Sequence, residues 1–154
     1  MKKLFTLLMV LTASMAGWAQ NSNDYLEMTR EVLSVEKKAA IAEIMVLTEE
    51  ESAVFWEMYN DYQNALYKVH NERIAIIRDF ADNYETMTDE KADELWQSGM
   101  RYREDLHKLK KSWYAKFKKE LPAGKVVTFF QAESKIETLV DAQLALEIPL
   151  LDTE

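Results

Sequence analysis

The chain contains no cysteine, and its 154 residues include only three glycines, two prolines and two histidines. Without thiols there is no disulfide and no thiolate nucleophile. The residues that usually separate short strands are nearly absent. Ala, Leu, Glu, Lys, Met and Gln, which favour helices, fill long segments instead. The composition therefore predicts an all-α fold that is stabilised by side-chain packing alone.

Motifs of catalysis are also missing: the sequence has no glycine-rich phosphate loop, no nucleophile elbow and no zinc-protease helix motif. We therefore expect a protein that is not an enzyme and has no cofactor. His70 and His107 are the weak candidates for metal ligands, with Glu72 or Glu104 beside them if two long helices pack antiparallel. Isolated histidines on polar helices are usually solvated, so no metal site is predicted.

A leader is indicated at the N-terminus. Lys2 and Lys3 precede an uncharged apolar run over residues 4–16, and Gly17-Trp18-Ala19 follows. This layout is typical of a secretory signal peptide, which we place at residues 1–19. The run is too short for a permanent membrane span, and no cysteine follows it to carry a lipid. We expect residues 20–154 to form a single helical domain, soluble in the periplasm and not inserted in the membrane.

Acidic residues dominate the chain, which has a formal net charge of −8. Removal of Lys2 and Lys3 leaves 17 basic against 27 acidic side chains, a net charge of −10, which disfavours nucleic-acid binding. The charge is segregated: residues 43–61 contain six acids and no base, and residues 101–119 contain eight bases and two acids. Such polarity either steers self-association, gives a basic surface for acidic clients, or simply marks a solvated face.

Apolar residues at helical spacing predict four helices. The first runs from about Asn23 to Met45. The second opens at Leu47 and Thr48, where Thr48 is the expected cap and Glu51, three residues on, completes a capping box. Its apolar stripe continues for about 35 residues, which is long for a compact domain.

The third predicted helix starts in the same way, at Met87 and Thr88, with Thr88 as its cap. A heptad-like apolar seam follows and ends at Leu121. Pro122 is expected at the start of the fourth helix, as a cap residue or in the first turn, and this helix runs to about Glu147. Two long central helices in extended hairpins are therefore the predicted architecture.

Aromatic side chains are too many for a thin helical layer to bury. The stripe of Phe55, Tyr59 and Tyr62 occupies one helix face and leaves Trp56 about 100° away, and Tyr114 likewise lies beside the seam that contains Trp113. Exposed apolar area of this kind is typical of an interface. We expect the interface to serve self-association or contact with client proteins.

These features resemble the LTXXQ-motif periplasmic proteins, a family similar to the Spy and CpxP chaperones and to zinc-resistance-associated proteins, and they look closest to a Bacteroidetes-type branch. The resemblance rests on two motifs, on the cysteine-free hairpins behind a signal peptide, and on the stretches FWEMYNDYQ, LPAGKVVTFFQAESKI and EIPL. The motifs are Leu47-Thr48-Glu49-Glu50-Glu51 and Met87-Thr88-Asp89-Glu90-Lys91. Glu51 and Lys91 stand where the family motif has glutamine.

The resemblance implies a thin, curved antiparallel homodimer that binds unfolded or partly folded clients without ATP. We therefore predict a periplasmic, chaperone-like binding protein that holds aggregation-prone envelope proteins during envelope stress. The residues predicted to contact clients are aromatic or basic: Trp56, Tyr59, Arg101, Arg103, Lys110, Lys111, Trp113 and Tyr114.

Two other functions fit the same sequence. The protein is alternatively an envelope stress sensor that acts on a membrane signalling partner, as in an extracytoplasmic sigma-factor circuit. A metal-responsive periplasmic protein is the third reading, and it would depend on His70 and His107.

Overall fold

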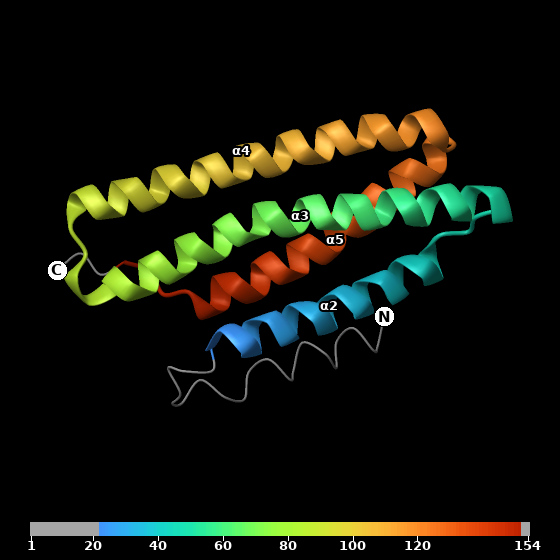
Figure 1. Cartoon of the computed structure of the whole chain (residues 1–154). Helices are drawn as coiled ribbons and strands as arrows, with labels where there is room; N and C mark the ends of the chain where they lie inside the picture. Colours follow the sequence, from blue (N-terminus) through green and yellow to red (C-terminus); the bar gives the residue numbers. More distant parts are fainter. Residues whose placement is uncertain (1–21, 152–154) are drawn as a thin grey trace. The chain divides into compact units, whose positions relative to one another are not determined.

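The computed structural model describes residues 22–151, with side chains from residue 30 onward (Figure 1). This part of the chain is helical and contains no strand, which confirms the predicted all-α fold and the two long central helices that pack together. The predicted leader, residues 1–19, lies outside the described residues. The elements are α2 (Ser22–Ile44), α3 (Glu49–Asn83), the short 3-10 helix η1 (Tyr84–Thr86), α4 (Asp89–Glu120) and α5 (Ala123–Glu147).

The chain divides into two compact units, residues 1–45 and residues 46–154. Helix α2 belongs to the first unit, and α3, η1, α4 and α5 form the second. The single domain expected over residues 20–154 stays a prediction. Within residues 22–151, none of the helices combines the length and the apolar character that crossing a membrane requires.

Helices α3 and α4 begin directly after Thr48 and Thr88. The Thr48 hydroxyl accepts a hydrogen bond from the Glu51 backbone N–H at 3.3 Å, and a Glu51 carboxylate oxygen accepts one from the Thr48 backbone N–H at 2.9 Å, which makes a full capping box. The Thr88 hydroxyl accepts from the Lys91 backbone N–H at 3.2 Å. The Lys91 side chain has no acceptor for the Thr88 backbone N–H, so no capping box forms here. Its ammonium instead donates to Asp79 of α3 at 2.7 Å.

Helix α5 starts directly after Pro122. Pro122 is the N-cap with an extended ψ of 134°, so the first helical residue is Ala123. The Pro122 carbonyl accepts hydrogen bonds from the backbone N–H groups of Lys125 and Val126 at 3.0 and 3.2 Å. Leu121, with ψ 151°, is also extended because a following proline disfavours helical backbone. Pro122, which the sequence placed among the residues that start or cap helices, is therefore the N-cap of α5.

The second unit is a three-helix arrangement that runs back and forth. Helices α3 and α4 lie antiparallel and are joined at one end through η1, and α5 returns from the far end of α4 (Figure 1). As a result α3 and α5 run in the same direction, and α4 runs opposite to both. The chain brings the start of α3, the end of α4 and the start of α5 to one end of this unit.

An aromatic core fills that end. Its largest fully buried side chains include Phe55, Tyr62, Phe117 and Phe129. The ring centroids of Phe117 and Phe129 lie 5.1 Å apart, and Phe55 meets Phe129 edge-on at 5.2 Å and 88°. Aromatic pairs at these separations add roughly 0.5–1.5 kcal/mol each beyond the area they bury. The core therefore anchors all three helices to one another at this end.

The opposite end is less completely filled. Helix α3 has no buried residue after Leu66, and α5 has none after Glu133. The apolar side chains that follow, among them Ile76, Ile77 and Leu144, are only half-buried. Packing of α4 with α5 is therefore tight beside the aromatic core and leaves space further along the helices.

Candidate functional site

A cavity of about 540 Å³ occupies this space, and we name it the α4–α5 groove. It receives side chains from all three helices of the second unit. Three of them are aliphatic and most of the others are charged or polar, so the groove has both apolar and charged lining. Its lining residues are Arg73, Ile76, Ile77, Gly99, Tyr102, Arg103, Leu106, His107, Lys110, Glu137 and Asp141.

Helical spacing explains why one flank of α4 borders the groove. Gly99, Arg103 and Lys110 follow one another at intervals of four and seven residues, so they lie on the same side of the helix. Tyr102 and Leu106, on the neighbouring face, are buried. At Gly99 a Cβ atom would meet no other group within 4 Å, so the missing side chain leaves open space in the groove.

Charges in the groove are mostly paired across helices. Arg73 of α3 donates to Asp141 of α5 at 2.7 Å, and Lys110 of α4 forms an ion pair with Glu137 of α5. Arg103 is exposed and has no carboxylate partner among residues 30–151. The groove therefore holds three permanent cations against two carboxylates, although the whole chain is acidic.

Tyr102 fixes one side of the groove. A hydrogen bond of 3.0 Å joins its hydroxyl to Nδ1 of His70, and the Arg73 guanidinium lies 5.8 Å from its ring centroid. Burial raises the pKa of the Tyr102 phenol above its ordinary value. Its hydrogen bond to His70 links α3 to α4.

A second, shallower cavity of about 470 Å³ lies between α4 and α5, nearer the aromatic core. We call it the Tyr114 cavity. The Tyr114 ring packs edge-on against Phe130 at 5.5 Å, and the Lys118 ammonium lies 5.8 Å from the Tyr114 ring centroid. Its lining residues are Tyr114, Val127, Phe130, Gln131, Ser134 and Lys135.

An exposed tryptophan and an exposed methionine extend the groove-lining flank of α4 toward the N-terminus of this helix. Trp96 is 66% exposed, and Met100, one turn further on, is 42% exposed. Trp96, Arg103, Lys110 and Tyr114 follow at intervals of seven, seven and four residues, which keeps them on one side of the helix. This flank of α4 therefore presents aromatic, aliphatic and cationic groups in one row.

Trp96 and Met100 were not among the contact residues predicted from the sequence. Trp96 directly follows Leu95, a buried seam residue, so it lies about 100° from the seam. Trp56 and Tyr114 were predicted to be exposed because they lie beside an apolar stripe. Trp96 has the same position relative to the seam and could have been predicted for the same reason.

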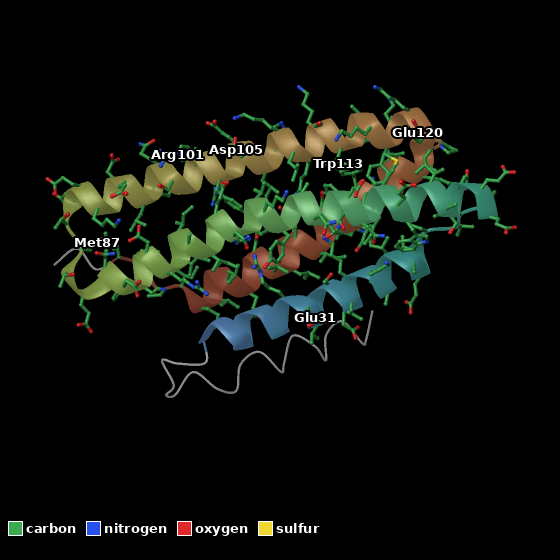
Figure 2. All side chains as sticks on the ribbon, in the orientation of Figure 1. Glu31, Met87, Arg101, Asp105, Trp113 and Glu120 are labelled. Atoms are coloured by element: carbon green, nitrogen blue, oxygen red, sulfur yellow. The ribbon has the colours of Figure 1, made fainter. Side chains whose placement is uncertain are left out.

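Of the residues predicted to contact clients, Arg103 and Lys110 line the α4–α5 groove and Tyr114 lines the second cavity. Arg101 lies with Asp105 on the side of α4 that faces away from α3 (Figure 2), and its guanidinium donates to the Ser98 hydroxyl at 2.7 Å. Lys111 is exposed on α4 but does not line either cavity.

The other predicted contact residues belong to the aromatic core or its border. Tyr59 is only 3% exposed, so it packs inside the protein. Trp56 is half-buried, 5.3 Å from the Tyr59 ring. Trp113 is also half-buried, 5.8 Å from the Tyr62 ring, and its outer side is covered by the Lys116 ammonium at 4.0 Å. These side chains offer less free apolar area than the sequence suggested.

The two histidines have different surroundings. His70 is half-buried on α3 and bonded to Tyr102, and His107 is exposed at the groove. Among the described residues, no three histidine, aspartate or glutamate side chains come together in a group that could hold a metal ion. The structure therefore offers no geometric support for metal binding in this part of the chain.

Comparison of the chain with protein-family models, curated proteins and solved structures gives no match. The likeness to the LTXXQ-motif proteins is carried by the residues named above and stays a prediction.

Proposed function

We propose that this protein is an ATP-independent, chaperone-like binding protein that holds unfolded or partly folded segments of other proteins. The observation that carries the proposal is the flank of α4, where the exposed Trp96 and Met100 adjoin the α4–α5 groove. Exposed apolar area beside polar and charged groups is characteristic of protein-binding surfaces. The predicted signal peptide supports the periplasm as its location and envelope proteins as its clients.

Binding is by burial of apolar area. Trp96 offers a large rigid side chain, and Met100 an adaptable one that accepts varied partners. The basic residues of α4 speed the encounter with clients that carry negative charge. Neither step consumes a nucleotide.

Suppression of aggregation tests the proposal. A purified chain starting at Gln20 is mixed with a reduced client whose aggregation is followed by light scattering. At several-fold molar excess we expect the scattering to fall strongly. The double variant Trp96→Ser/Met100→Ser is expected to lose most of this effect.

Helix α5 provides a matched control. Leu139 and Leu146 are exposed to 44% and 83%, and both lie about 180–200° around the helix from Glu137 of the groove. The double variant Leu139→Ser/Leu146→Ser removes a similar amount of exposed apolar area and is expected to suppress aggregation as the parent does. Equal loss in both double variants, or no suppression by the parent, would contradict the proposal.

A further inference from the structure

The α4–α5 groove has space for an apolar side chain of a ligand. Ile76 and Ile77 of α3, which are half-buried, and the buried Leu106 of α4 all line it. The open space above Gly99 lies next to them on the α4 side. An aliphatic side chain of a ligand that entered the cavity at Gly99 would leave water and bury apolar area against the cavity lining, which favours binding.

The charges beside this space favour a negatively charged ligand. Both carboxylates of the groove already have cationic partners, Asp141 with Arg73 and Glu137 with Lys110. A basic ligand would therefore compete with one of these partners for a carboxylate. Arg103, one turn from Gly99, is exposed and has no carboxylate partner within residues 30–151. Its planar guanidinium is suited to a carboxylate, which it can bind with two parallel hydrogen bonds.

We propose that the α4–α5 groove selects client segments in which an aliphatic side chain is followed closely by a carboxylate. The aliphatic side chain enters the space at Gly99, and the carboxylate pairs with Arg103. This inference rests on the proposed client binding and specifies which segments of a client are held. Segments of the same apolar content with amide or basic side chains bind more weakly.

Three fluorescein-labelled peptides of equal length test the selection by fluorescence anisotropy. Their Gly/Ser frames carry Leu-Leu-Asp-Glu, Leu-Leu-Asn-Gln or Leu-Leu-Lys-Lys at the centre. In low salt we expect the acidic peptide to bind about tenfold more tightly than the amide peptide, as a charge-assisted hydrogen-bond pair implies. The advantage should shrink as salt rises, because an exposed pair is screened. Equal affinity for the acidic and the amide peptides overturns the inference.

Two variants separate the charged from the apolar contact. Arg103→Gln is expected to remove the preference for the acidic peptide while leaving the binding of the amide peptide unchanged. Lys119→Gln removes the same charge from an exposed position of α4 outside the groove and is expected to retain the preference. If both variants lose the preference equally, the effect comes from the general charge of α4 and the inference falls.

Gly99→Leu fills the groove from within. Because a Cβ at this position meets nothing within 4 Å and leucine is a better helix former than glycine, the variant is expected to fold at least as stably as the parent. We expect its affinity for all Leu-Leu peptides to fall at least several-fold. Unchanged affinity in a folded Gly99→Leu variant overturns the placement of the aliphatic side chain.

The outcomes also distinguish this inference from the function on which it rests. Suppression of aggregation without discrimination between the peptides would overturn the selection and leave the chaperone-like function standing. Absence of both suppression and peptide binding would overturn the two together.

Discussion

Lys125, in the first turn of α5, forms an ion pair with Glu51, the carboxylate that closes the capping box at the start of α3. The same carboxylate accepts a hydrogen bond from the Thr48 backbone N–H at 2.9 Å. The Glu51 side chain therefore completes the N-terminal cap of α3 and also joins α3 to α5. Its partner Lys125 is 74 positions away in the sequence. The hydrogen bond from Lys125, followed by that from Thr48, holds the pKa of Glu51 below its ordinary value.

This shift predicts a pH dependence of stability. Because the pKa of Glu51 is lowered by folding, its contribution is fully present above its unfolded-state pKa of about 4.3 and is lost as the pH falls through the folded-state value. Glu51→Gln removes the charge. We expect the variant to unfold at lower urea concentration than the parent at pH 7, with the two midpoints converging below about pH 4.

Glu57→Gln is the matched control, since Glu57 is exposed on the same helix outside the capping box. Its urea midpoint is expected to stay close to that of the parent across this pH range. A Glu51→Gln deficit that persists unchanged at low pH would show that the carboxylate charge is not the cause.

Tyr62 combines a well-packed ring with an unsatisfied hydroxyl. The ring meets Phe129 edge-on at 5.8 Å and 80°, but the buried hydroxyl has no hydrogen-bond partner in the part of the chain that the structure describes. Tyr62→Phe keeps the ring and removes the unsatisfied group. We expect the free energy of unfolding to rise by about 1 kcal/mol in urea titrations.

Tyr102→Phe is the opposite case, because that hydroxyl is bonded to His70 at 3.0 Å. Its loss is expected to lower the free energy of unfolding by about 1 kcal/mol. Destabilisation by both substitutions would mean that the Tyr62 hydroxyl has a partner after all.

Phe117 is predicted to be a main support of the aromatic core. It is fully buried, and its ring lies within 6.4 Å of those of Tyr62 and Phe129. Phe117→Ala is expected to cost about 3–5 kcal/mol of unfolding free energy, measured by urea or thermal unfolding. Trp96→Ala, at an exposed position of the same helix, is expected to change it by less than about 0.5 kcal/mol. Similar costs at both positions would contradict this assignment of core and surface.

Gly99→Ala should stabilise the protein. Gly99 lies in the interior of α4, and a Cβ there meets no group within 4 Å, so alanine adds helix propensity without a clash. The expected gain is about 1 kcal/mol in unfolding free energy. Gly124→Ala, which also meets open space but lies in the first turn of α5, is expected to gain less. A loss at Gly99 would indicate that the open space is filled in the folded protein.

The sequence was informative wherever the physical cause is local. The starts of α3 and α4 follow from threonine hydroxyls that accept a backbone N–H three residues ahead, and Thr48 and Thr88 could be read directly for this reason. The start of α5 at Pro122 has a local cause too, since a proline is suited to the position just before a helix or to its first position.

The candidate site was only partly predictable. Arg103, Lys110 and Tyr114 were identified from charge and aromatic content, and they do line the two cavities. Trp56 and Trp113 were identified by the same reasoning, but neighbouring rings and the Lys116 ammonium cover much of them. Periodicity shows which side of a helix is apolar, and it does not show how much of the adjoining flank another helix covers.

By itself, the sequence determined that this protein is helical, where α3 and α4 start, and that the two are long, because propensity, capping and apolar spacing act within a few residues. Only the tertiary structure decided that α4 and α5 leave a groove, and that Lys110 pairs with Glu137 and Arg73 with Asp141 across 27 and 68 positions of chain. Those pairings depend on the direction in which α5 packs against the hairpin. That direction is set by the fit of the whole aromatic core, which no single segment encodes.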